Sequence, residues 1–120
     1  MEQTEKLQKK IFNKIPKQYK DTVLRAITFA QKIHKQDLRY NQEPLINHLL
    51  KIALLSVENN LDVNSTISAI LHQIPLEEEN IEYIKNNFDS NILKILQKIE
   101  KIRESTNAPD TPNEIIIKYI

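Results

Sequence analysis

Apolar side chains recur at the spacing of an α-helical face through most of this 120-residue chain. No segment alternates polar and apolar residues with the period of two that is typical of a half-buried strand. This pattern predicts an all-α fold, a single-domain bundle of about six or seven helices. The clearest helical face spans about four turns, and its members are Tyr19, Val23, Ala26, Ile27, Ala30, Ile33 and His34.

Prolines and polar clusters divide the periodic pattern into separate helices. Pro16 and Pro75 each end a run of apolar residues, whereas Pro44 is expected to open a helix. The expected helices, in chain order, are one that ends before Pro16, then 16–34, about 44–57, 62–75, 77–88, 90–102 and 114–120.

Polar residues with short side chains mark where several of these helices begin. We expect Asp62 or Asn64 to cap the fourth helix and Ser90 to cap the sixth. Residues 35–43 lack periodicity and are predicted to be a loop, and residues 105–110 a polar linker. Thr111 and Pro112 are a cap and a first helical residue for the last helix.

Charge and composition exclude several classes of function. The chain has 17 basic and 16 acidic residues, so no strong overall field attracts it to nucleic acid or to a membrane surface. It contains no cysteine and no glycine, which excludes thiolate metal sites and glycine-dependent phosphate loops. No apolar stretch approaches the roughly 20 residues of a membrane helix, and we expect a cytoplasmic protein.

Three histidines are the candidate functional groups. His34 ends an apolar face, where it either bonds a neighbouring carbonyl group or lies beside a site. His48 and His72 lie on consecutive helices, and antiparallel packing could bring them to one metal ion. Acidic residues 77–79 follow Pro75, where the helix macrodipole favours carboxylates for structural reasons alone.

Several segments together resemble the hydrolase domain of the RelA/SpoT family, an HD domain. Residues 38–48 are similar to the family's Arg-Lys-Ser-Gly-Glu-Pro-Tyr-Ile-x-His-Pro signature, and residues 69–73 correspond to its Leu-His-Asp motif. Residues 26–35 resemble its entry helix, Phe88-Asp89 its Phe-Gly step and Lys101-Ile102 the end of its Val-Thr-Lys-Leu run. The similarity covers about residues 21–120.

The resemblance implies a manganese site. In the family, two histidines, the aspartate after the second histidine and a later aspartate hold the metal. By matched position His48 and His72 are the histidine ligands, and Gln73 replaces the first aspartate with a neutral amide. The last aspartate would follow just after Ile120, so the resemblance implies a chain truncated before that ligand.

The resemblance also implies a substrate, guanosine tetra- or pentaphosphate, from which family members cleave the 3′-pyrophosphate. Arg39 is expected to contact phosphate, and Tyr40 stands where the family has a phosphate-contacting lysine. Glu77 takes the place of one member of the catalytic Glu-Asp pair, whereas Leu76 replaces the other. Leu45 stands in place of a tyrosine.

These matches and replacements leave three functions open. The first is a degenerate HD domain without efficient hydrolysis, which acts as a binding module for a guanosine polyphosphate or another nucleotide, or survives as a remnant. The second is an active manganese-dependent phosphohydrolase, and the third is a plain helical interaction domain that holds no cofactor. Apolar residues 115–117 and Tyr119 also suggest a homodimer formed through the last helix.

Overall fold

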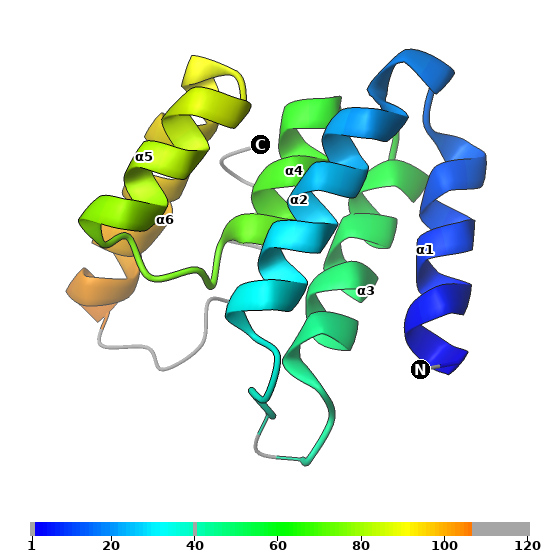
Figure 1. Ribbon diagram of the computed structural model, residues 1–120, viewed down its shortest axis with the longest axis horizontal. Helices are drawn as coiled ribbons and strands as arrows, with labels where there is room; N and C mark the ends of the chain where they lie inside the picture. The colour runs from blue at the N-terminus through cyan, green and yellow to red at the C-terminus, as the bar shows by residue number, and fades with distance from the viewer. Residues whose placement is uncertain (1, 40, 107–120) are drawn as a thin grey trace.

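The computed structural model describes residues 2–39 and 41–106 and contains only helices and loops within them (Figure 1). This confirms the all-α prediction. The elements are α1 (Glu2–Lys14), the 3-10 turn η1 (Lys17–Tyr19), α2 (Lys20–Ile33), α3 (Leu45–Glu58), α4 (Val63–Leu71), α5 (Glu78–Asn87) and α6 (Ser90–Thr106).

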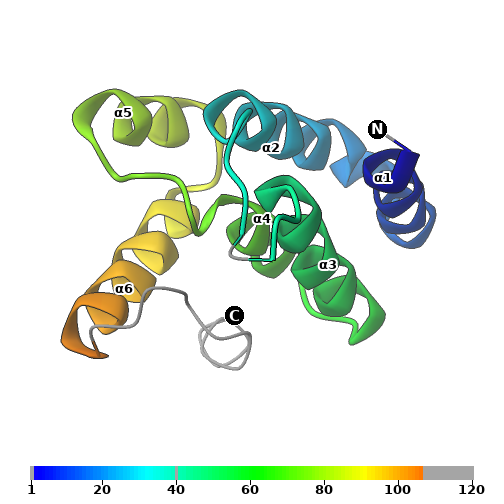
Figure 2. The ribbon, with the colours of Figure 1, turned by 90° about the horizontal axis from the view of Figure 1, so that it is seen from below.

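The helices form two layers. Figure 2 shows α5, α2 and α1 in one row, and α6, α4 and α3 in the row below it. Each helix of the first row packs on one of the second: α5 on α6, α2 on α4 and α1 on α3. Within the second row α4 also contacts both neighbours, which makes this short helix the centre of the bundle.

The composition of α4 explains its central position. Every residue from Ser65 to Leu71 is buried, and the segment has no charged side chain. A helix without a polar face must be covered on all sides. Two of its polar side chains have partners close by: the Ser65 hydroxyl donates to the Asp62 carboxylate at 2.6 Å, and the hydroxyl groups of Thr66 and Ser56 in α3 lie 3.2 Å apart.

One hydrophobic core runs through the bundle and takes side chains from all six α-helices. Apolar residues at helical spacing reach this core from the first and last described helices: Leu7 and Ile11 are buried in α1, and Ile92, Leu96 and Ile99 in α6.

Helix starts agree with the sequence in part. Asp62, one of the two alternatives expected for this position, caps α4. Its carboxylate accepts a hydrogen bond from the Ser65 backbone N–H at 2.9 Å. The prediction that Ser90 caps the last long helix was wrong. Ser90 is the first residue of α6, and the Asp89 carboxylate accepts the Asn91 backbone N–H because it lies one position earlier.

Helix ends differ more from the expectations. The second helix begins at Lys20, because the residues after Pro16 form a separate 3-10 turn. α4 ends at Leu71 rather than near Pro75, so His72 is the residue that closes the helix. α6 continues through Thr106, into the linker expected from residue 105. The helix expected at 114–120 and the dimer contact assigned to it lie outside the described residues.

None of the six α-helices combines the length and the apolar character needed to cross a bilayer, a result that covers residues 2–39 and 41–106.

Candidate functional site

The loop between α2 and α3 is fixed by a compact set of backbone contacts. Arg39 N–H donates to the carbonyl oxygen of Glu43 at 2.8 Å, and Gln42 N–H donates to that of Arg39 at 2.8 Å. Leu38 and Pro44 form an isolated antiparallel bridge around this turn. The backbone therefore places Arg39 beside the first turn of α3.

The turn requires a backbone conformation that is unusual for its sequence. Gln42 has a φ of 70°, in the left-handed region that favours glycine. The family signature has glycine at this position, but the present chain contains none. In this chain a glutamine therefore adopts a conformation that is best suited to glycine.

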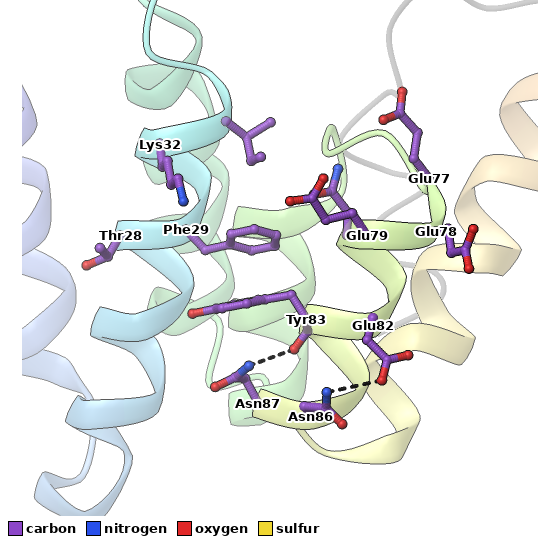
Figure 3. Close-up of a pocket in the computed structure, with 12 residues that line it drawn as sticks. Thr28, Phe29, Lys32, Glu77, Glu78, Glu79, Glu82, Tyr83, Asn86 and Asn87 are labelled. Atoms are coloured by element: carbon purple, nitrogen blue, oxygen red, sulfur yellow. Dashed lines mark hydrogen bonds between the residues drawn. The ribbon is translucent and has the colours of Figure 1, made fainter.

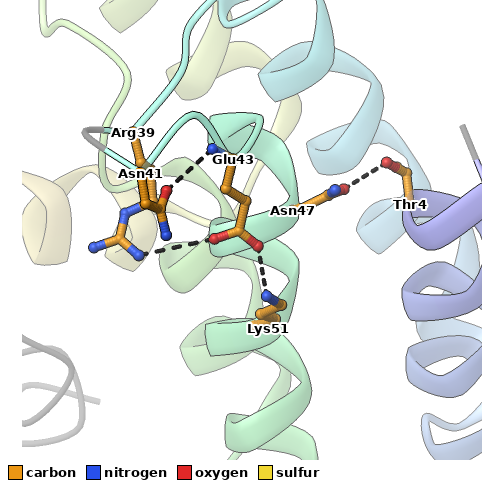
Figure 4. Close-up of polar contacts among 6 residues, drawn as sticks. All are labelled: Thr4, Arg39, Asn41, Glu43, Asn47 and Lys51. Carbon is orange, nitrogen blue, oxygen red and sulfur yellow. Dashed lines mark hydrogen bonds and ion pairs between the residues drawn. The ribbon is translucent and has the colours of Figure 1, made fainter.

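Glu43 joins two cations at the start of α3 (Figure 4). One carboxylate oxygen lies 3.9 Å from Nη1 of Arg39, and the other lies 2.5 Å from Nζ of Lys51. The Glu43 side chain is only 17% exposed, whereas that of Lys51 is 47% exposed. Arg39, which was predicted to bind substrate, therefore lies in an ion-pair network. Tyr40, the other residue predicted to bind substrate, falls outside the described residues.

His48 is half-buried on α3. The residue before it, Asn47, is buried and accepts a hydrogen bond from the Thr4 hydroxyl of α1 (Figure 4). The first turn of α3 therefore carries both a structural contact to α1 and one of the two candidate metal ligands.

His72 is buried and held by its own backbone surroundings. Its Nδ1 lies 2.7 Å from the carbonyl oxygen of Ala69, so this nitrogen carries the proton of the neutral ring and donates it. Nε2 is then the acceptor nitrogen, and the side-chain Nε2 of Gln73 lies 3.4 Å from it. The carbonyl oxygen of His72 accepts a 3.0 Å bond from Arg103 of α6.

Leu76 and Glu77 have opposite environments. Leu76 is partly buried and packs against the hydrophobic core. Glu77 is exposed and precedes the first residue of α5. It lines a cavity of about 990 Å³ that lies between α2 and α5.

Aromatic side chains form much of this cavity's apolar surface (Figure 3). The rings of Phe29 in α2 and Tyr83 in α5 stack with centroids 4.2 Å apart. Lys32 stands on the α2 side and Glu79 on the α5 side. Glu77 therefore belongs to a groove between two helices that is bordered by charged groups of both signs.

His34 is buried, but the prediction that it bonds a neighbouring carbonyl group was wrong. Its Nδ1 donates instead to the Asp37 carboxylate at 2.9 Å. This bond satisfies Nδ1 of the buried ring, whereas Nε2 has no hydrogen-bond partner within residues 2–39 and 41–106. In the part of the chain that the structure describes, no three His, Asp, Glu or Cys side chains form a group able to hold a metal ion.

Sequence reasoning missed the shared role of Glu43 and Lys51. Their separation of eight residues gives no signal, because it spans a loop end and the first turns of a helix. It also missed the Phe29–Tyr83 stack and the bond from Arg103, which depend on how separate helices pack.

The chain belongs to the HD domain family, whose model matches residues 26–115. Within that family it is similar to the guanosine-3′,5′-bis(diphosphate) 3′-pyrophosphohydrolases of Borreliella burgdorferi and Aquifex aeolicus. It is 31% identical to the former over 105 residues, 81% of this chain and 16% of the relative. Identity to the latter is 32% over 105 residues, 83% of this chain and 15% of the relative.

A probable GTP diphosphokinase of Arabidopsis thaliana chloroplasts is also similar, at 26% identity over 101 residues, which cover 82% of this chain and 13% of the relative. The chain thus spans about one sixth of the length of these relatives or less.

Proposed function

We propose that this HD domain binds a guanosine polyphosphate or a related nucleotide without hydrolysing it efficiently. The observation that carries the proposal is the contact between His72 and Gln73. The expected metal-binding nitrogen of His72 faces an amide nitrogen at 3.4 Å, where the resemblance implies a ligand carboxylate.

The donor set of the described residues is a poor match for a divalent ion such as manganese. An amide N–H is a donor and cannot coordinate a cation. Turning the amide would offer its oxygen, but that oxygen carries no charge to balance the ion. His48 and His72 would be the remaining ligands, and the metal, if bound, would activate a water molecule.

Two groups expected to act on that water are also altered. Leu76 offers neither a base nor a hydrogen bond, and its side chain contributes to the core. Glu77 retains a carboxylate, but it lies exposed on the α2–α5 groove. Loss of groups that act as a unit typically lowers the rate by about a thousandfold or more, so efficient hydrolysis is not expected.

One group expected to support binding, Arg39, is preserved. Arg39 is held by the turn contacts and by Glu43, and a guanidinium suits phosphate oxygens geometrically. The relatives named as pyrophosphohydrolases of guanosine-3′,5′-bis(diphosphate) make this nucleotide the first one to test.

The test is calorimetric titration with guanosine tetraphosphate, followed by a hydrolysis assay in manganese. We expect saturable nucleotide binding with no release of pyrophosphate above the protein-free rate. Manganese-dependent turnover that is lost in both His48→Ala and His72→Ala would overturn the catalytic half of the proposal. Absence of nucleotide binding would overturn the binding half.

A further inference from the structure

We propose that Lys51 is a second phosphate-contacting cation, which acts together with Arg39. The inference deepens the proposed function and depends on it for the identity of the nucleotide. It assigns to Lys51 the role of binding the phosphate end of the ligand, on the basis of the ion-pair network at the start of α3.

The two cations are held close by one carboxylate. Nη1 of Arg39 and Nζ of Lys51 lie 3.9 Å and 2.5 Å from the two oxygens of Glu43. Figure 4 shows the guanidinium and the ammonium on the two sides of this carboxylate. Both cations are therefore gathered around one side chain at the start of α3.

The charge of the network favours an anion. The described ion pairs bring two cations to one carboxylate, at a site where Arg39 and Glu43 are about four-fifths buried. Partial burial strengthens the attraction of these cations for an anion because solvent screens it less. A phosphate group, which carries more than one negative charge, is the complementary ligand.

Lys51 has the donor capacity and the exposure for this contact. An ammonium has three N–H donors, of which one goes to Glu43. Its side chain is 47% exposed, so a ligand can approach without unfolding the helix. Because Glu43 already fixes the ammonium, less side-chain entropy is lost when the phosphate binds.

The position on α3 connects this pair with the rest of the candidate site. Lys51 follows His48 by three residues, so the two side chains leave the helix on neighbouring faces. Arg39 reaches the same end of the helix from the preceding loop. A nucleotide phosphate bound by the pair would lie at the end of α3 that carries His48.

The experiment measures binding of guanosine tetraphosphate and of inorganic pyrophosphate by calorimetry. We expect Lys51→Gln to weaken both ligands about tenfold, the usual size of one lost charge-assisted contact. Lys51→Arg should recover most of the affinity because it restores the charge. Lys98→Gln on the exposed side of α6 removes the same charge elsewhere and should change affinity less than twofold.

A double-mutant cycle tests whether the two cations share one phosphate. Arg39→Gln and Lys51→Gln should each weaken pyrophosphate binding, and the combined loss should differ from the sum of the two. Thermal unfolding of each variant checks that the loop and α3 remain folded.

The outcomes separate this inference from the proposed function. Nucleotide binding that is unchanged in Lys51→Gln overturns the role of Lys51 and leaves the proposed function intact. If pyrophosphate binds in a way that depends on Lys51 but the guanosine nucleotide does not bind, the role of the cation pair is supported. The proposal that the ligand is a guanosine nucleotide is then overturned. Failure of both ligands to bind the unmodified chain overturns both.

Discussion

Replacing Gln42 with glycine should stabilise the protein. The residue has a φ of 70° in the turn closed by the bonds between Arg39, Gln42 and Glu43. A left-handed backbone costs a residue with a side chain roughly 1–2 kcal/mol. Glycine removes that cost but gives the unfolded chain additional entropy of roughly 0.5–1 kcal/mol.

The difference is a net gain of about 0.5–1 kcal/mol, which corresponds to a rise in Tm of about 2–4 °C for a domain of this size. Differential scanning calorimetry of the Gln42→Gly variant measures it directly. The exposed side chain of Gln42 makes the comparison clean, since little packing is lost.

Three matched variants test the reasoning. Gln42→Ala keeps a Cβ atom and should give no gain. Gln97→Gly, at an exposed position within α6, should lower stability by about 1 kcal/mol. Asn60→Gly, where φ is 58°, should gain less, because asparagine tolerates this conformation better than glutamine. A Gln42→Gly variant that melts at or below the unmodified protein would refute the strain argument.

The cap of α4 and the contact between α1 and α3 give two further predictions. Asp62→Ala should lower the free energy of unfolding by about 1 kcal/mol, because the Ser65 N–H loses its cap; urea denaturation measures it, and Asp62→Asn should retain most of the stability. Thr4→Ala should lower the free energy of unfolding by about 1–3 kcal/mol, because the buried amide oxygen of Asn47 loses its donor. Hydrogen exchange in α1 should increase, and unchanged exchange there would argue against this contact.

The helical fold was predictable because its signal is local. Stripes such as Ile92, Leu96 and Ile99 follow the 3.6-residue period within one helix, and their burial confirms the prediction. Helix ends were less predictable, since they depend on competition between neighbours. Asp89 caps α6 in place of Ser90, and the chain after Pro16 forms a 3-10 turn before α2 begins.

The candidate site was predictable only in outline. Motif order located His48, His72 and Arg39, but it could not show that Gln73 faces His72 or that Glu43 holds Lys51. Such contacts depend on side-chain orientation and on the path of a loop. Metal binding and nucleotide binding remain predictions for the experiments above, and the C-terminal dimer also remains a prediction.

The central position of α4 bears on how this chain can diverge from its relatives. Its last turn leads directly into His72, whose ring is buried and bonded to the carbonyl group of Ala69. A substitution there would disturb packing at the middle of the bundle, whatever the chemistry at Nε2. Selection for stability alone would therefore retain this histidine, even in a chain that no longer bound a metal. The presence of the histidine is thus no evidence that the metal site is in use.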